Sequence, residues 1–277
     1  MNAPTEKFPR GTELPSQSPL FWVSQKDRYL RQLLIRDIQS LTGRQLIVYF
    51  ANRVESPQID HRDIALMTEL CADVKGKPTD LMLETGGGMT DAAEGLVSLL
   101  QSLIPDLRVI VVGWAKSNGT LLGLAAKSIV MGATSELGPI EPSFNNVPCS
   151  ILISDEIKKT NFPLHMFGVF ALAQTKALAK RLLAQGMMKG RPDTEIDETI
   201  KKLATRDHFF SHGSVINHQE AKQLGLAIDY LEPESELWKK LWLLYCMYDS
   251  DCRRDRYVKV FEGPGVSTSI AATKSVP

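Results

Sequence analysis

Residues 81–142 decide the fold, and they run LMLETGGGMTDAAEGLVSLLQSLIPDLRVIVVGWAKSNGTLLGLAAKSIVMGATSELGPIEP. Two short apolar runs inside this stretch, residues 81–83 and 108–112, have the length and composition of buried strands. Each run ends in a turn of small residues, and each turn leads into a helical pattern, over residues 92–102 and 120–127. This repetition of strand, turn and helix predicts a parallel sheet built by right-handed crossovers.

The two turns carry residues that suit the binding of a negatively charged oxygen. Gly86, Gly87 and Gly88 follow the first predicted strand, and glycine lets the backbone approach a ligand closely. They precede a helix N-terminus, where free N–H groups favour an anion. Ser117 follows the second predicted strand, and the next N–H belongs to Asn118. The N–H groups of Gly88 and Asn118 are therefore candidate donors to the oxyanion of a tetrahedral intermediate.

The glycine spacing alone does not select acyl chemistry. Glycine-rich turns between strands and helices are common in α/β proteins, where they bind a phosphate or no ligand at all. The triplet is not the G-x-G-x-x-G fingerprint of dinucleotide sites, and no P-loop lysine follows it. We therefore expect neither NAD nor pyridoxal phosphate, and no other cofactor.

The rest of the chain continues the alternation of strands and helices. Its predicted elements are strands at residues 45–51, 128–131 and 257–261, the last at a sheet edge, and helices at residues 27–42, 59–74, 170–189, 195–204 and 234–248. Arg28, Arg31 and Arg36 in the first of these helices are expected on its solvated face. The predicted divisions are a disordered tail over residues 1–18, a main α/β domain over 19–233, a C-terminal helix and edge strand over 234–261, and a disordered tail over 262–277.

Composition excludes several classes of protein. The 32 basic and 32 acidic residues balance, so no net charge argues for a nucleic-acid partner. The four cysteines are scattered, as in a protein of a reducing compartment, and form no metal-binding pattern with histidine. Residues 1–17 lack the apolar core of a secretory signal, and no apolar run reaches the ~18 residues of a membrane span. We expect a cytoplasmic protein without a metal site.

Three runs of sequence carry a resemblance to a known family. They are AKSNGT at residues 115–120, IVMG at 129–132 and SELGPIEP at 135–142. They resemble the serine dehydrogenase proteinase (SDH) family of the ClpP/crotonase superfamily, whose relatives include Clp protease subunits and SppA-type signal peptide peptidases. The resemblance spans residues 48–229. It implies an α/β ClpP/crotonase-like fold with a mostly parallel sheet of repeated ββα and βαβ units flanked by helices.

The resemblance also implies roles for residues in both turns. Ser117 matches the nucleophile, and Gly88 and Asn118 match the oxyanion-hole N–H groups. Gly87 and Met89, on either side of Gly88, are then expected to bind substrate. One position departs from the family, because Asn118 stands where alanine is usual. Its backbone donor is kept, but its side chain is large enough to crowd the acyl pocket.

A lysine is the first candidate for the general base. Clp-type proteases have a histidine near the position of Ile140, and this chain has none there. SppA-type relatives use a serine–lysine dyad, which favours Lys158, with Lys159 as its neighbour. A lysine can act as a base only where burial lowers its pKa from about 10.4. Lysines beside acidic residues more often lie on a solvated helix face.

Histidines are the second kind of candidate for the base. His165 lies in an apolar segment, where a buried core histidine is the more common outcome. His208 and His212 follow Asp207, but sequence neighbours rarely form the contacts of a catalytic triad. The sequence does not decide among Lys158, Lys159 and these histidines.

The combined interpretation is a serine hydrolase, most simply a homo-oligomeric serine peptidase that cleaves peptide or protein substrates. One alternative is a catalytically inactive peptide-binding or assembly protein of the same fold. A second is crotonase-like acyl-CoA chemistry, which needs no serine at the nucleophile position.

Trp238 and Trp242 near basic residues fit either a helix packed on the body or peripheral contact with the inner face of a membrane.

Overall fold

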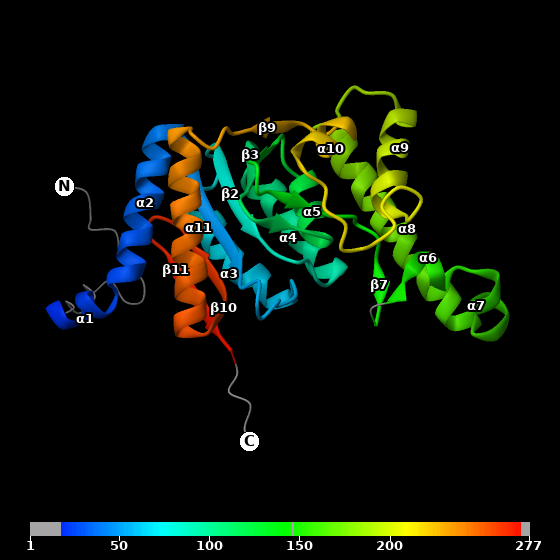
Figure 1. The fold of residues 1–277 in the computed structure, drawn as a ribbon, viewed down its shortest axis with the longest axis horizontal. Coiled ribbons are helices and arrows are strands. Elements are labelled where there is room, and N and C mark those ends of the chain that lie inside the picture. Colours follow the sequence, from blue (N-terminus) through cyan, green and yellow to red (C-terminus); the bar gives the residue numbers. More distant parts are fainter. Residues whose placement is uncertain (1–17, 146, 273–277) are drawn as a thin grey trace, which may run out of the picture.

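The computed structural model describes residues 18–145 and 147–272 and is built on one seven-stranded sheet (Figure 1). The strand order is β11 (Ser267–Ala271), β10 (Tyr257–Glu262), β1 (Gln45–Ala51), β2 (Thr79–Glu84), β3 (Leu107–Val111), β5 (Ile129–Met131) and β9 (Ile228–Tyr230). The five strands from β1 to β9 run parallel, and β10 and β11 add antiparallel pairs at one side. The predicted mostly parallel α/β sheet is confirmed.

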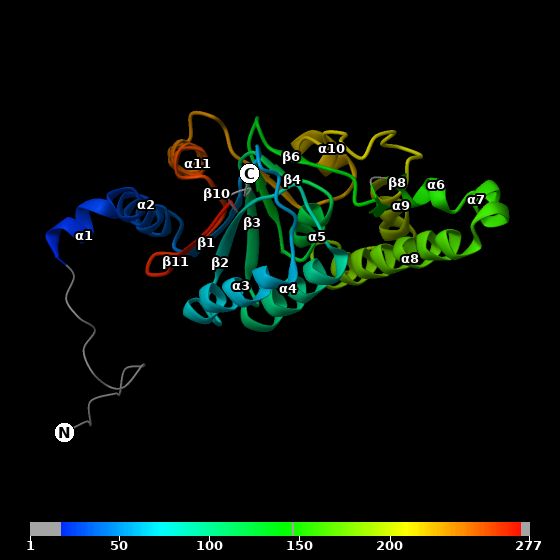
Figure 2. The same cartoon turned by 90° about the horizontal axis from the view of Figure 1, so that it is seen from below.

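Helices cover both faces of the sheet (Figure 1, Figure 2). On one face lie α2 (Lys26–Thr42) and α11 (Glu236–Asp255), and on the other lie α3 (His61–Asp73) and α4 (Thr90–Leu103). Strand β1 shows how the sequence builds both cores, since side chains alternate between the faces of a strand. Val48 and Phe50 pack with α2 and α11, whereas Ile47 and Tyr49 belong to the core on the α3 side.

The remaining elements within the described residues are two short strand pairs and seven further helices. Strand β4 (Trp114–Ala115) pairs with β6 (Glu136–Leu137), and a hairpin of β7 (Ser143–Phe144) and β8 (Val147–Pro148) follows. The other helices are α1 (Pro19–Ser24), α5 (Asn118–Leu124), α6 (Cys149–Leu152), α7 (Asp155–Thr160), α8 (Phe162–Gln185), α9 (Asp193–Ala204) and α10 (His218–Gln223). Helices α6 to α9 project away from α2 and α11 (Figure 1).

Two predictions for the C-terminal part were wrong. Strand β10 is not an edge strand, because β11 pairs with its outer side. Residues 267–271 were expected in a disordered tail, but the turn after Glu262, closed by the bond from Gly263 N–H to Val266 O, folds them back as β11. Serine, threonine and isoleucine suit the pleated surface of an edge strand. Residues 1–17 and 273–277 of the two predicted tails lie outside the described residues.

Arg31 is a third correction, because it is buried rather than solvated. Its guanidinium pairs with Glu262 at 2.7 Å and with Asp251, and the Tyr248 hydroxyl donates to Glu262 at 2.6 Å. These partners come from β10 and α11, far along the chain, so local charge spacing could not reveal them. The pairing ties α2 to the C-terminal elements.

Helix α8 begins earlier than the sequence predicted, at Phe162 rather than near residue 170. The Asn161 side chain caps it by accepting from Leu164 N–H, and a proline occupies its first turn.

Helix α11 packs Trp238 against the sheet side, while Trp242 stays 41% exposed. Within residues 18–145 and 147–272, no helix is both long enough and apolar enough to cross a bilayer.

Lys259 connects β10 to the start of α3. Its ammonium lies 2.8 Å from both carboxylate oxygens of Asp63 and 3.1 Å from Asp60, and the Tyr49 hydroxyl also donates to Asp63. Lys259 is 2% exposed and Asp63 is fully buried. Asp60 caps α3 and directly follows Ile59, so its ion pair with Lys259 fixes the start of α3 next to Ile59.

We expect Lys259→Met to lower the free energy of unfolding by about 3–5 kcal/mol, because it leaves the Asp63 carboxylate buried without its cation. Urea denaturation at neutral pH measures the change. The double variant Lys259→Met/Asp63→Asn should recover part of the loss, since it buries no unpaired charge. A single variant as stable as the wild type would contradict this account.

Candidate active site

Ser117 sits on a strained turn between β4 and α5. Its backbone has φ 53° and ψ −121°, a left-handed conformation that residues other than glycine adopt rarely. The turn packs tightly on the glycine segment, where a Cβ on Gly87 would lie 2.7 Å from Ser117 Cβ. Position 87 therefore needs glycine, and the serine side chain stays partly exposed beside it.

The glycine turn leaves one N–H group available next to the serine. Ile59 N–H donates to Gly87 O at 2.8 Å, and Met89 N–H donates to Ile59 O at 2.9 Å. In the described part of the chain, the N–H groups of Gly88 and Asn118 donate to no protein acceptor. Free N–H groups on adjoining turns are what an oxyanion site requires.

The Asn118 side chain joins the two turns. Its Nδ2 donates to Gly88 O at 2.5 Å and to Thr90 Oγ1 at 3.3 Å, and the residue is 6% exposed. The sequence suggested that this side chain would crowd the acyl pocket. Its amide instead holds the carbonyl of Gly88, which fixes the orientation of the glycine turn.

A groove runs from the glycine turn to α8. Its cavity volume is about 680 Å³. Met89 lines it beside the glycine turn, and Phe144 of the hairpin and Phe167 and Phe170 of α8 line it as well. Phe170 is 66% exposed, and the rings of Phe144 and Phe167 lie 4.7 Å apart. The predicted substrate residue Met89 thus lies in the groove, while Gly87 is buried beneath Ser117.

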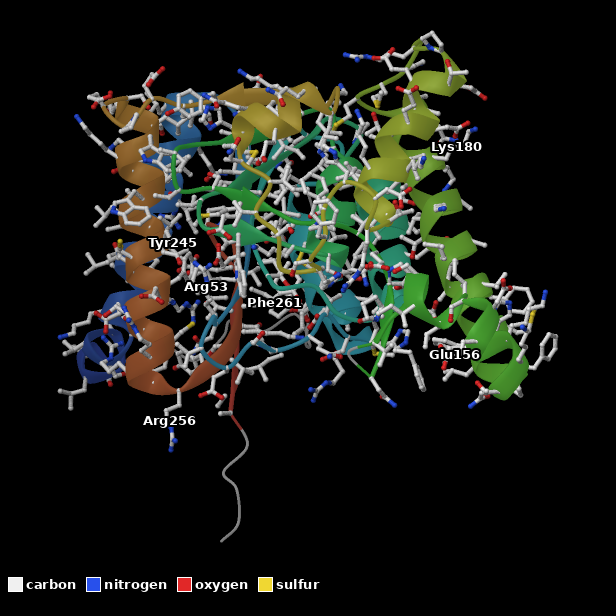
Figure 3. All side chains as sticks on the ribbon, turned by 45° about the vertical axis from the view of Figure 1, so that its right-hand side comes forward. Arg53, Glu156, Lys180, Tyr245, Arg256 and Phe261 are labelled. Atoms are coloured by element: carbon white, nitrogen blue, oxygen red, sulfur yellow. The ribbon has the colours of Figure 1, made fainter. Side chains whose placement is uncertain are left out.

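The predicted lysine bases lie away from Ser117. Lys158 and Lys159 are exposed on α7, at the opposite end of α8 from α5 (Figure 1, Figure 2). Glu156 marks α7 in Figure 3, on the other side of the molecule from Arg53. This conformation does not bring Lys158 and Ser117 together, so the dyad stays a prediction.

The histidines differ in their surroundings. His165 is 9% exposed on α8, and His208 is exposed with its ring 4.6 Å from that of Phe209. His212 lies nearer to the turn, because the carbonyl of the next residue, Gly213, accepts a hydrogen bond from Lys116, the residue before Ser117. Burial lowers the pKa of His212 below 6.5, Glu141 opposes this shift, and Arg206 and Lys116 reinforce it. His212 is therefore neutral at pH 7, as a general base must be.

Lys116 itself is held in place. Its ammonium donates to Gly213 O at 3.0 Å and pairs with Glu136 at 2.9 Å. The bond to Gly213 fixes the backbone next to His212. The sequence does not single out His212 from the other histidines. Its segment comes close to the Ser117 turn through the bond between Lys116 and Gly213, a tertiary contact that the local sequence does not reveal.

The family model of ClpP-like SDH-type serine proteinases matches residues 59–265. The chain belongs to this family. The match includes both turns, most of the groove and β10. It confirms the predicted ClpP-like fold. For this SDH-type chain, Ile140 occupies the loop position where Clp-type proteases were expected to have histidine; it is 2% exposed and its N–H donates to Leu203 O at 2.8 Å.

Relatives of this SDH-type chain occur in Methanocaldococcus jannaschii. The uncharacterised protein MJ0137 is 31% identical over 182 residues, which make up 63% of this chain and 63% of the relative. A second uncharacterised protein, MJ1495, is 24% identical over 202 residues, or 71% of this chain and 65% of the relative. The chain covers less than two thirds of the length of either relative.

Two solved structures are similar to the chain. A mutant of ClpP1 from Listeria monocytogenes is 16% identical with a TM-score of 0.45, and the similarity covers 72% of this chain and 98% of that one. A mutant of 1510-N, a membrane-bound stomatin-specific protease, is 22% identical with a TM-score of 0.42, covering 66% and 79% of the two chains.

Proposed function

We propose that the chain is a serine peptidase in which Ser117 is the nucleophile and the N–H groups of Gly88 and Asn118 form the oxyanion hole. The observation that carries this proposal is the strained Ser117 turn, packed on Gly87 and flanked by two free N–H groups. Strain of this kind persists where the surrounding structure over-determines it, as at catalytic sites. Family membership supports the same reaction class.

The reaction follows from the placement of these groups. Ser117 Oγ attacks the carbonyl carbon of a peptide bond while a base accepts its proton. The negative charge that develops on the carbonyl oxygen is stabilised by the two N–H groups. The base then returns the proton to the leaving amine, and water hydrolyses the acyl-enzyme by the same steps in reverse roles.

The groove supports an extended peptide with large apolar side chains as the substrate. It begins at Gly88 and Met89 and presents Phe144 and Phe170 to solvent. Burial of such rings against an apolar side chain of the substrate contributes about 25 cal/mol per Å² of apolar surface removed from water. A homo-oligomeric state stays a prediction.

The base has two candidates that single replacements can separate. Lys158 would have to reach Ser117 from α7, where it is exposed in this conformation. His212 is favoured by its proximity to Lys116 and by its lowered pKa, which would bring activity to a plateau near neutral pH.

Fluorophosphonate labelling tests the proposal and the base together. We expect an adduct on the peptide that contains Ser117, detected by mass spectrometry, at a rate that Lys158→Ala or His212→Ala lowers by about 10²–10⁴-fold if that residue is the base. Labelling elsewhere would contradict the assignment of Ser117. No labelling, combined with binding of apolar peptides, would establish the inactive peptide-binding alternative.

A further inference from the structure

Glu84 is a buried carboxyl group directly behind the glycine turn. It ends β2, is 1% exposed and precedes Thr85. Its Oε2 accepts from Trp114 N–H at 2.9 Å, whereas Oε1 has no hydrogen-bond partner among the described residues. A carboxyl group this buried with one hydrogen bond is costly, and such groups are rare unless paired.

The Glu84 carboxyl group occupies space that a side chain at position 113 would fill, and residue 113 is a glycine. A Cβ on Gly113 would lie 2.6 and 2.8 Å from the two carboxyl oxygens of Glu84, and 2.9 Å from Cε2 of Tyr245. Tyr245 comes from α11, so the carboxyl group is enclosed between the end of β2, the start of β4 and this helix. Figure 3 labels Tyr245 and Arg53, whose side chains both contribute to the surroundings of this carboxyl group.

The charged groups that face Glu84 do not neutralise it. Arg53, from the loop after β1, lies over the Trp114 ring at 4.3 Å and pairs with Glu136 of β6 at 3.7 Å. Asp249 of α11 adds a second negative charge. Arg53 is therefore engaged with Trp114 and Glu136, and Asp249 repels an ionised carboxylate at Glu84.

Glu84 is consequently an uncharged acid at neutral pH. Burial raises its pKa to about 8 and Asp249 acts in the same direction, while the Trp114 N–H, the Arg53 charge and the Gly113 N–H only partly oppose them. Burial likewise raises the pKa of Tyr245 to about 12, so the phenol stays neutral throughout this range. Glu84 is thus the group of this cluster whose charge changes near pH 8.

Hydrogen bonds connect Glu84 to Ser117 through β4. After the bond from Trp114 N–H to Glu84, Thr85 N–H donates to Trp114 O at 3.0 Å, and Lys116 N–H donates to Thr85 O at 3.0 Å. The next residue is Ser117. This ladder aligns the end of β2, which carries the glycine turn, with the strand that carries the serine.

We propose that Glu84, enclosed behind the glycine turn and bonded to Trp114 N–H, is a positioning residue that keeps the Ser117 turn in register with the glycine turn. This inference rests on the proposed function. An ionised Glu84 needs water or a cation, which it can gain by opening its contact with Tyr245 or by drawing Arg53 away from Trp114 and Glu136. Either change moves Trp114, and the ladder carries that movement to Ser117.

The first test compares the labelling rates of Glu84→Gln and wild type across pH. Glutamine keeps the shape of the neutral acid and cannot ionise. The labelling rate of Glu84→Gln divided by that of the wild type should be near one below about pH 7. Above pH 8 this ratio should rise by up to about tenfold per pH unit, because the wild type ionises and the variant cannot. Glu69→Gln, at an exposed position of α3, is the control and should keep a ratio near one. A flat ratio for Glu84→Gln would overturn the proposal.

A second test does not require a reactive serine. In the Ser117→Ala background, the infrared band of a protonated carboxyl group and the emission of Trp114, isolated by difference from Trp114→Phe, should titrate together near pH 8. Both changes should be absent when Glu84→Gln is added. If every variant resists labelling but this titration is present, the proposed peptidase function fails while the coupling of Glu84 to the turn stands. Trp114 emission that does not follow the band would overturn the coupling.

Discussion

Replacing Ser117 with alanine should lower kcat for peptide hydrolysis by about 10⁴–10⁶-fold, the loss that removal of a serine nucleophile causes in other proteases. Alanine keeps the Cβ that packs on Gly87, so the turn itself should persist. The remaining rate would come from the two N–H donors, which polarise the bound carbonyl toward attack by water. A fluorogenic peptide with large apolar residues, matched to the groove of Phe144 and Phe170, measures the change.

Ser98→Ala supplies the control for this experiment. Ser98 is exposed on α4, where alanine is a good helix former, so its replacement should leave hydrolysis and stability nearly unchanged. Circular dichroism and thermal unfolding should be close to wild type for both variants. If purified Ser117→Ala hydrolyses the peptide at the wild-type rate, the catalytic serine is not Ser117.

The sequence predicted those parts of the fold that local patterns determine. Strand β1 was predicted with its observed bounds, Gln45–Ala51, because an apolar run of that length between turn residues has few alternatives. The two turns were also predicted, since glycines after a strand and before a helix restrict the backbone. Helix α4 extends only slightly beyond its predicted range.

Features that depend on distant partners escaped prediction. Strand β11 forms because β10 offers it an edge, and Arg31 is buried because Glu262 and Asp251 receive its charge. Glu84 stands in an ordinary strand sequence, and only Trp114 and Tyr245 reveal how closely it is enclosed. The general base stays open for the same reason, since a base is defined by its distance from Ser117 and not by its neighbours in sequence.

The buried carboxyl of Glu84 lowers the stability of the fold at neutral pH. Its pKa in the folded chain, about 8, exceeds the ordinary value of 4.5 expected when the chain is unfolded. As pH rises from 4.5 to 8, the unfolded chain releases the proton while the folded chain retains it, so the free energy of unfolding falls across this window. Glu84 thus costs stability beside a reactive turn, and a group that costs stability is better explained by a role in function than by a role in folding.

Gly88→Ala should lower kcat by about 10²–10³-fold, with a smaller effect on KM, because one oxyanion donor is displaced. A Cβ at this position would lie 2.2 Å from Ile59 N and 2.6 Å from Ile59 O, distances that no side-chain movement can relieve. The glycine turn must shift instead, breaking the bonds between Ile59 and the residues on either side of Gly88. Because the donor is used mainly in the transition state, the loss should appear in kcat.

The control for this variant is Gly265→Ala, in the turn between β10 and β11, where a Cβ would meet no atom within 4 Å. Gly88→Ala should also lower the Tm, since Ile59 immediately precedes Asp60, the capping residue that Lys259 holds. Measuring kcat at saturating peptide separates the loss of the donor from the loss of stability. A folded variant with wild-type kcat would show that Gly88 contributes no donor. A low kcat in a chain that still binds peptide would place the loss in the transition state, where the geometry of the two turns predicts it.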